Sequence, residues 1–288
     1  MAQITPQQVK ELREKTGAGM ADCKNALIES QGDMKVAIEI LRKKGAASAA
    51  KRADRSANEG LIVTKCSPDG KTATIVEINS ETDFVARNEL FVQYANQVAK
   101  AILLNNPTTI DDVFELKVND DTIRGLHNEI LAKFSENIQI RRFLKITTEG
   151  YIGEYTHAGS KLAVLVETNI ANPSEQVISK IRDIAMQIAA MKPSYIDRES
   201  VPEDDLLKEI EIYKEQAITE GKKPEIAERI AKGRLEKFYQ DQCLVEQLFV
   251  KDPSKTIKDV VAEISNLIGY EARIKRIVRF FLGESLEQ

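Results

Sequence analysis

The sequence predicts an α+β protein with an N-terminal three-helix bundle, a duplicated core of small antiparallel sheets, and an inserted helical hairpin. The strongest observation is an internal repeat: residues 59–102 and 149–192 align without a gap at an offset of 90 residues. Helix-spaced apolar residues fill the first 45 positions, before the repeat begins. A highly charged, helix-patterned stretch at 199–240 interrupts the second copy.

The first 45 residues are typical of three short helices. Thr5 to Gln8 has the pattern of a capping box, Gly17 to Gly19 permits a turn, and Gly32 ends the second helix before Asp33 caps the third. The expected inner faces, in chain order, are Val9 and Leu12, then Met20, Cys23 and Leu27, then Val36, Ile40 and Leu41. A bundle this small is marginal by itself and leaves no room for a catalytic cleft, so we expect a docking domain.

Residues 46–58 are rich in alanine and carry Lys51, Arg52 and Arg55. This composition favours a solvated helical linker. The alternative is a basic strip that contacts phosphate or an acidic partner, but no aromatic residues are interleaved with the charges. The linker interpretation is therefore preferred.

The duplicated core combines strands and helices in the same order twice. Residues 72–79 have the β-branched pattern of a strand, and apolar residues spaced as on a helix follow from Phe91 to Ile102. A further helix at 122–134 and a strand at 138–147 have counterparts near the C-terminus at an offset of 134. We expect the first half at 59–148 and the second at 149–198 and 241–288, each with helices on one face of a small sheet, packed side by side.

The growth of the offset from 90 to 134 places an insertion of about 44 residues in the second copy. Within residues 199–240, Leu206, Ile210, Tyr213 and Ala217 follow heptad-like spacing, and Gly221 to Pro224 breaks the chain. This predicts an antiparallel helical hairpin. It is either a dimerisation arm or a solvated hairpin that packs only on itself, and the pattern does not decide between them.

Composition and charge exclude several classes of protein. The net charge is −4, so no strong overall field attracts nucleic acid or a membrane surface. Cys23, Cys66 and Cys243 are too far apart in sequence for a typical metal or redox motif. The first residues lack the features of a signal peptide, and no run of about 18 apolar residues occurs. We therefore expect a cytoplasmic protein with reduced thiols.

Catalytic chemistry is weakly represented. His127 lies in a helical pattern and His157 in a turn, with no metal-ligand spacing around either. No phosphate-binding glycine motif is present, and carboxylate pairs are too common among 45 acidic residues to indicate acid–base catalysis. The expectation is a protein that is not an enzyme and that holds no metal or cofactor.

The two copies differ most after their matched residues Asn79 and Asn169. The first copy continues with Ser80 to Asn88 and carries Phe84 in this polar connection, whereas the second continues with Ile170 to Glu175. An aromatic residue in a polar loop is a typical interface anchor, because it buries a large apolar area at low entropic cost. The alternative is that Phe84 tucks under its own domain as a plug.

Several motifs, together and in this order, resemble the elongation factor Ts family over nearly the whole chain. They are Leu12-Arg13, Thr16 to Met20 with Asp22 to Lys24, Glu77 to Asn79 with Glu81 to Asn88, Asn137 to Arg142, Ile188 to Pro193 and Val250 to Thr256. The chain departs from the family pattern at Leu248, where relatives often have proline.

The resemblance implies a guanine-nucleotide exchange factor for elongation factor Tu, with a UBA-like N-terminal bundle, no cofactor and no direct contact with nucleic acid. It implies that Thr82, Asp83, Phe84 and Val85 enter the GTPase near its Mg²⁺ and phosphate site. It also suggests Arg13, Met20 and His157 as partner contacts. A rival interpretation is a translation-associated RNA-binding protein that uses the basic linker with Arg141 and Arg142.

Overall fold

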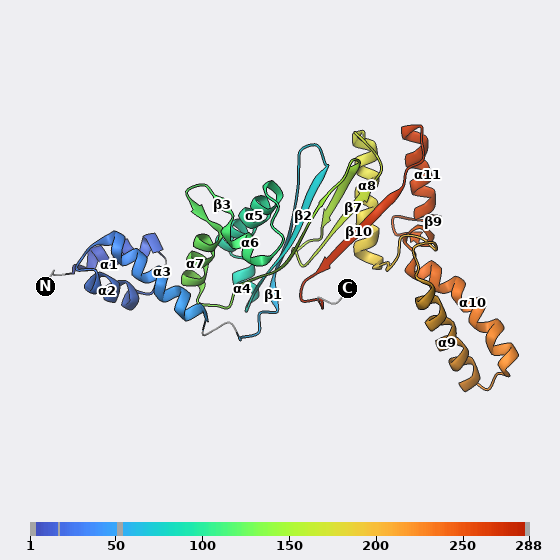
Figure 1. Ribbon diagram of the computed structural model, residues 1–288, viewed down its shortest axis with the longest axis horizontal. Helices are drawn as coiled ribbons and strands as arrows, with labels where there is room; N and C mark the ends of the chain where they lie inside the picture. Colours follow the sequence, from blue (N-terminus) through green and yellow to red (C-terminus); the bar gives the residue numbers. More distant parts are fainter. Residues whose placement is uncertain (1–3, 17, 51–53, 286–288) are drawn as a thin grey trace.

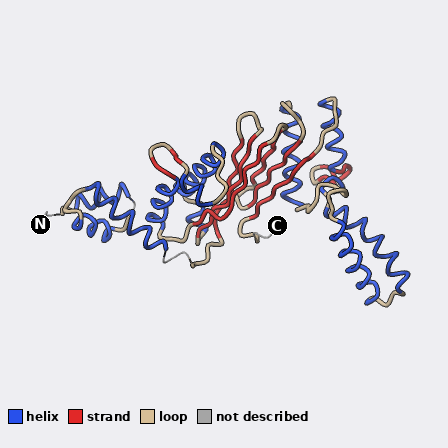
Figure 2. Tube along the Cα trace, viewed as in Figure 1, coloured by secondary structure: helices blue, strands red, loops and turns tan. Residues whose placement is uncertain are grey.

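A computed structural model describes residues 4–16, 18–50 and 54–285 of the chain (Figure 1). The molecule is elongated. Helices lie at the N-terminal end, strands occupy the middle between layers of helices, and a helical hairpin projects at the far end (Figure 2). This arrangement confirms the α+β fold class that the sequence predicts. Among the described residues we find no helix whose length and apolar character would let it cross a bilayer.

The N-terminal bundle consists of α1 (Pro6–Thr16), α2 (Met20–Glu29) and α3 (Met34–Ala50). The capping box is present, since the Gln8 amide donates to Thr5 Oγ1 at 3.2 Å and the Thr5 amide donates to Gln8 Oε1 at 2.9 Å. Asp33 caps α3 by accepting hydrogen bonds from the amides of Lys35 and Val36. Gly17 lies outside the described residues.

The bundle core contains most, but not all, of the expected apolar residues. Its buried members are Val9, Leu12, Ala18, Cys23, Ala26, Leu27, Ala37 and Leu41. The prediction that Val36 faces the core is wrong, because Val36 is exposed. The face of α3 that packs against the other two helices includes Met34, Ala37, Ile38 and Leu41. Met20 is also exposed.

The predicted helical linker is corrected at its C-terminal part. Helix α3 continues to Ala50, residues 51–53 lie outside the described part, and residues 54–58 are not helical. There the chain is held by the core instead, because Asn137 Nδ2 donates to the Arg55 carbonyl at 2.7 Å. Ser56 and Asn58 also favour non-helical backbone.

The repeat in the sequence becomes a repeat of sheets. The first half pairs β1 (Glu59–Cys66), β2 (Thr72–Ser80) and β5 (Gln139–Thr147) in the order β1-β2-β5. The second half pairs β6 (Tyr151–Thr156), β7 (Leu162–Thr168) and β10 (Ile274–Phe281) in the order β6-β7-β10. All pairs are antiparallel, and the β2/β5 and β7/β10 ladders both shift register at the equivalent position, beside Glu77 and Glu167.

Helices cover the outer face of each sheet. In the first half these are α4 (Asp83–Ala86), α5 (Glu89–Leu104), α6 (Ile110–Glu115) and α7 (Ile123–Phe134), with a small hairpin of β3 (Lys117–Val118) and β4 (Asp121–Thr122). In the second half they are α8 (Glu175–Met191) and α11 (Ile257–Ile268), with η1 (Leu244–Glu246) and a hairpin of β8 (Leu248–Phe249) and β9 (Asp252–Thr256).

The inner faces of the two sheets pack against each other. One apolar cluster joins Ile62, Ile75 and Ile146 of the first half with Ile152 and Leu165 of the second. Val76 and Ile78 of β2 point the other way, into the cluster that contains α5 and α7. Since side chains alternate along a strand, β2 is buried on both faces. The two halves therefore meet sheet to sheet.

The inserted hairpin consists of α9 (Glu203–Thr219) and α10 (Pro224–Gln242), which project from the second half (Figure 1). Ala217, Ala227 and Ala231 are buried where the two helices meet. At the base, Arg198 pairs with Glu236 at 2.8 Å and with Glu246. These contacts explain how the hairpin packs on itself. A role of the hairpin in dimerisation stays a prediction.

Candidate partner-binding site

The segment that distinguishes the first copy, residues 80–88, forms a fixed turn that we call the Phe84 turn. Its polar residues cap the helices that follow them: Thr82 Oγ1 accepts from the Val85 amide at 3.4 Å at the start of α4, and Asn88 Oδ1 accepts from the Leu90 amide at 3.0 Å at the start of α5. Ser80 Oγ donates to the Thr82 carbonyl at 3.0 Å. These local hydrogen bonds order part of the turn.

Glu136, which follows α7, holds the base of the Phe84 turn. Its Oε1 accepts from Thr82 Oγ1 at 2.7 Å, and its Oε2 accepts from the amides of Glu81 and Thr82, both at 3.1 Å. Glu81 Oε1 in turn accepts from the Asn137 amide at 2.7 Å. Sequence reasoning missed Glu136, because nothing in its local pattern separates it from the other acidic residues.

Phe84 points outward from this turn, and its side chain is 84% exposed. Val85 and Ala86 beside it are buried in the core of the first half. The interpretation of Phe84 as a plug of its own domain is therefore wrong, and Val85 occupies that role. Thr82 is half-buried by its contacts with Glu136, and Asp83 is half-buried beside Arg87. Phe84 is therefore the most exposed of the four residues of the predicted site.

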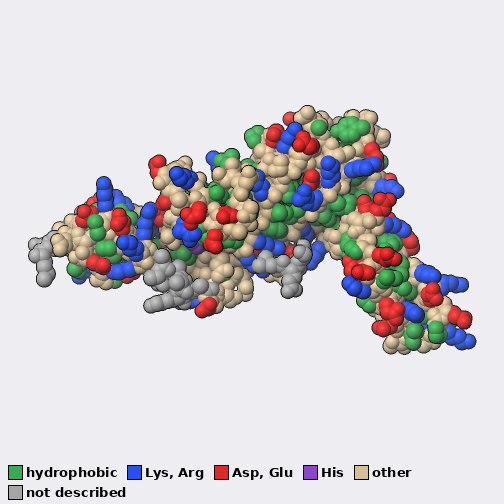
Figure 3. Space-filling view, viewed as in Figure 1, with side chains coloured by type: hydrophobic (Ala, Val, Ile, Leu, Met, Phe, Trp, Pro, Cys, Tyr) green, Lys and Arg blue, Asp and Glu red, His purple; other side chains and the backbone are tan. Residues whose placement is uncertain are grey.

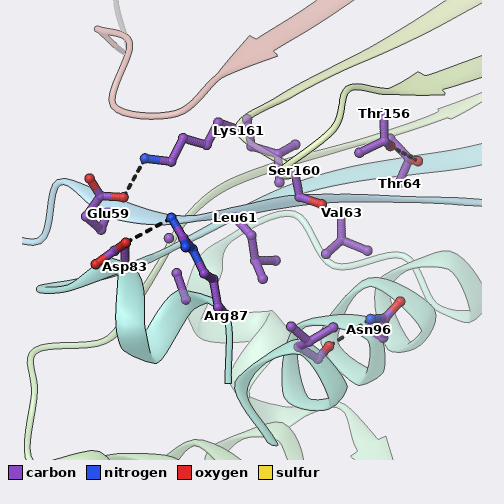
Figure 4. Close-up of a pocket in the computed structure, with 15 residues that line it drawn as sticks. Glu59, Leu61, Val63, Thr64, Asp83, Arg87, Asn96, Thr156, Ser160 and Lys161 are labelled. Carbon is purple, nitrogen blue, oxygen red and sulfur yellow. Dashed lines mark hydrogen bonds and ion pairs between the residues drawn. The ribbon is translucent and has the colours of Figure 1, made fainter. Parts of the chain in front are cut away.

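A groove of about 430 Å³ runs beside the Phe84 turn (Figure 4). Asp83 and Arg87 of the first half, which pair at 3.0 Å, line one side. The end of β6 lines the other side with Thr156, and the turn that leads to β7 lines it with Gly159 and Ser160. The Ile62 amide donates to the Ser160 carbonyl at 2.7 Å, which fixes the two halves at this point.

His157 lies in that same turn of the second half and is exposed. Its Nδ1 is 2.9 Å from the hydroxyl of Tyr155, which orients the ring. The structure therefore brings the turn with His157 and the Phe84 turn to opposite sides of one groove. Arg13 and Met20 are exposed on α1 and α2, at the N-terminal end of the elongated molecule and away from the groove (Figure 1).

His127 is a structural residue. Its Nδ1 is 2.7 Å from the Tyr94 hydroxyl, and its ring meets Phe114 edge to face at 5.0 Å between centroids. Burial, with a smaller effect of the Arg124 charge, lowers the pKa of His127 to about 4. The histidine is therefore neutral near pH 7.

This burial predicts a pH dependence of stability. The pKa of His127 is about 4 in the folded chain and about 6.5 when unfolded, so the unfolded chain binds more protons between these values. The free energy of unfolding should fall as the pH drops from about 6.5 to 4, by at most about 3 kcal/mol from this residue. Urea unfolding across this range, compared with His127→Gln, measures the effect. An identical slope in both proteins would exclude His127 as its source.

The chain also carries carboxylates and three cysteine thiols that could bind a metal or react. Within the described ranges, no group of three or more His, Cys, Asp or Glu residues could hold a metal ion. The three cysteines are free thiols. Burial raises the pKa of Cys23 and Cys66, and raises the pKa of Cys243 to about 11. They are consequently poor nucleophiles.

Two of the residues on which the RNA-binding interpretation depends are largely buried and already paired. Arg141 and Arg142 are 23% and 15% exposed in their side chains, and both pair with the buried Glu77. On the face drawn in Figure 3, basic and acidic side chains are interspersed. Lys51 and Arg52 lie outside the described residues.

Comparison with known proteins identifies close relatives. The sequence matches the family described as "Elongation factor TS" over residues 81–284. It is 45% identical to elongation factor Ts of Chloroherpeton thalassium, an alignment that covers 99% of this chain and 100% of the relative. It is 44% identical to that of Clostridium novyi, covering 99% and 94%. Identity to that of Clostridioides difficile is 42%, covering 100% and 95%.

Proposed function

The chain belongs to the elongation factor Ts family, and we propose that it is the guanine-nucleotide exchange factor for the GTPase elongation factor Tu. It would bind the GDP-bound GTPase, promote release of GDP and so allow GTP to bind. It makes and breaks no covalent bond in this role and needs no cofactor of its own. The observation that supports the proposal best is the exposure of Phe84 on a turn fixed by Glu136.

An exposed ring on a fixed turn is suited to act as a wedge. GDP is held through phosphate contacts and a Mg²⁺ ion whose octahedral shell tolerates little distortion. Phe84 need not touch the nucleotide, provided that it binds better to a GTPase whose phosphate site is displaced. By linkage, the factor then weakens GDP binding as much as GDP weakens binding of the factor.

The energies require more than Phe84. Acceleration of GDP release by several decades corresponds to roughly 4–6 kcal/mol of differential binding, at about 1.4 kcal/mol per tenfold. Burial of one phenylalanine contributes about 1.5–3 kcal/mol. The remainder must come from further contacts. The candidates are the groove, His157 on the turn that borders it, and the exposed Arg13 and Met20 of the N-terminal bundle.

The proposal is tested by release of a fluorescent GDP analogue from the cognate GTPase, with and without the protein. We expect release to accelerate in proportion to the protein concentration until it saturates. An unchanged release rate, together with RNA binding that weakens steeply with salt, would contradict the proposal and favour the RNA-binding alternative.

Glu136→Ala is predicted to slow nucleotide exchange, although Glu136 is not one of the residues that line the groove. The substitution removes three hydrogen bonds that fix Glu81 and Thr82, so the Phe84 turn loses its preorganised position. We expect about a tenfold lower maximal release rate and a loss of about 1–3 kcal/mol in unfolding free energy. Glu136→Gln, which retains one acceptor oxygen, should recover part of the rate. Equal rates for Ala and the native residue would show that the turn needs no such support.

A further inference from the structure

Glu77 is a fully buried carboxylate at the interface between the two halves. It lies on β2, on the side that faces the second sheet, and is 0% exposed. Its Oε1 accepts from Arg141 Nη1 at 2.8 Å and from the Gly283 amide at 2.9 Å, and its Oε2 accepts from Arg142 Nε at 2.6 Å. We call Glu77, Arg141 and Arg142 the charged joint.

The two arginines of the charged joint also hold the end of the second half. Arg141 Nη2 donates to the Glu284 carbonyl at 2.6 Å, and Arg142 Nη2 donates to the Phe281 carbonyl at 3.0 Å. The Arg142 guanidinium stacks over the ring of Phe280 at 4.1 Å. A carboxylate of the first half and the end of β10 therefore share the same two guanidinium groups.

The second copy provides an internal comparison. Its equivalent pair, Glu167 and Arg276, forms one ion pair of 2.9 Å between β7 and β10, within the second half. Lys275 stands where the first copy has Arg141. The second sheet thus forms with one Glu–Arg pair at this position, and the contacts that Arg141 and Arg142 make with residues 280–284 have no counterpart in that pair.

The charged joint is connected to the Phe84 turn through β2. Strand β2 carries Glu77 and ends three residues later at Ser80, where the turn begins. We infer that the charged joint is a positioning element for exchange: it fixes the second half, with His157, relative to the strand that presents Phe84. This inference rests on the proposed function, and it assigns Arg142 no contact with the GTPase.

The physical reason is stiffness. The GTPase would contact both halves of the protein. Binding energy from its contacts with the second half can help Phe84 displace GTPase groups only if the two halves do not move relative to each other. The apolar layer between the sheets is non-directional and resists separation more than rotation. Each arginine instead bridges the Glu77 carboxylate and a backbone carbonyl of the second half through charge-assisted hydrogen bonds, and two such bridges define an orientation.

Release kinetics with three variants test the inference. Arg142→Lys keeps the charge but cannot hold Glu77 and the Phe281 carbonyl together. Arg141→Lys installs the residue that the second copy carries at Lys275. Arg276→Lys is the matched control in the second half. We expect about a tenfold lower maximal release rate for Arg142→Lys and a smaller fall for Arg141→Lys, with half-saturating concentrations nearly unchanged, and a native rate for Arg276→Lys.

A measurement without the partner separates the two proposals. Lys100 lies in the first half and Lys258 in the second, and both are exposed. The double substitution Lys100→Cys and Lys258→Cys allows a spin label at each position, and Cys66→Ser removes the one native thiol that is not buried. The two labels report the distance between the halves. Arg142→Lys should broaden this distance distribution, and Arg276→Lys should not. A native distribution and release rate in Arg142→Lys, with Phe84→Ala impaired, would overturn the inference alone. No stimulation of release by the native protein would overturn the proposed function and the inference with it.

Discussion

Phe84→Ala is expected to lose most of the stimulation of GDP release while its free energy of unfolding stays nearly unchanged. The ring is 84% exposed in the free protein, so its removal takes away little of the folded core. In the complex the same ring would be buried against the GTPase, and burial contributes about 1.5–3 kcal/mol. At about 1.4 kcal/mol per tenfold, the expected loss is roughly 10- to 100-fold in release rate.

Leu104→Ala is the matched control for this experiment. Leu104 is also a large apolar side chain of the first half, is 70% exposed, and lies at the end of α5, outside the residues that line the groove. Its truncation should leave both exchange and stability close to native. Full exchange activity in Phe84→Ala, or an equal loss in Leu104→Ala, would show that the exposed ring is not the wedge.

Much of the fold follows from patterns that are local or repeated. The offsets of 90 and 134 correctly predict that the elements of the second half repeat those of the first, because a duplicated sequence satisfies the same packing rules twice. Caps such as Thr5 with Gln8 are predictable because their partners lie three residues apart. The helical hairpin is also predicted by spacing and by the break before Pro224.

The remaining features depend on contacts between distant segments. Glu136 supports Thr82 from 54 residues away, and no local pattern announces that contact. The exposure of Phe84 and the burial of Val85 are decided by which way a four-residue helix turns, which apolar character alone cannot specify. The charged joint looks like a basic pair in the sequence, and only the position of Glu77 between the sheets reveals its partner.

Gly60→Ala is predicted to have the largest effect on stability. Gly60 belongs to a Glu-Gly pair that recurs at Gly150, and both glycines lie against a backbone carbonyl of the neighbouring strand. A Cβ at position 60 would stand 2.2 Å from the Ile78 carbonyl oxygen, and one at 150 would stand 2.0 Å from that of Thr168. Gly60 also has a φ of +139°, a backbone conformation that is strained for residues with a side chain.

The clash at Gly60 involves backbone on both sides, so no side chain can move away to relieve it. Strand β1 must shift from β2 or change its backbone angles, and we expect a loss of at least about 3 kcal/mol in unfolding free energy. Two other glycines separate the causes. Gly269 has a φ of +80° and Gly233 lies within α10, and neither has an atom within 4 Å of the added Cβ.

Gly269→Ala isolates the backbone strain and should cost about 1 kcal/mol, whereas Gly233→Ala should stabilise its helix by about 0.5–1 kcal/mol. Urea unfolding of the three variants gives the ranking directly. If Gly60→Ala costs no more than Gly269→Ala, the close approach of β1 to β2 is not what requires glycine there. A clearly larger cost would mean that the close approach of β1 to β2 requires glycine at position 60, beside the turn that carries Phe84.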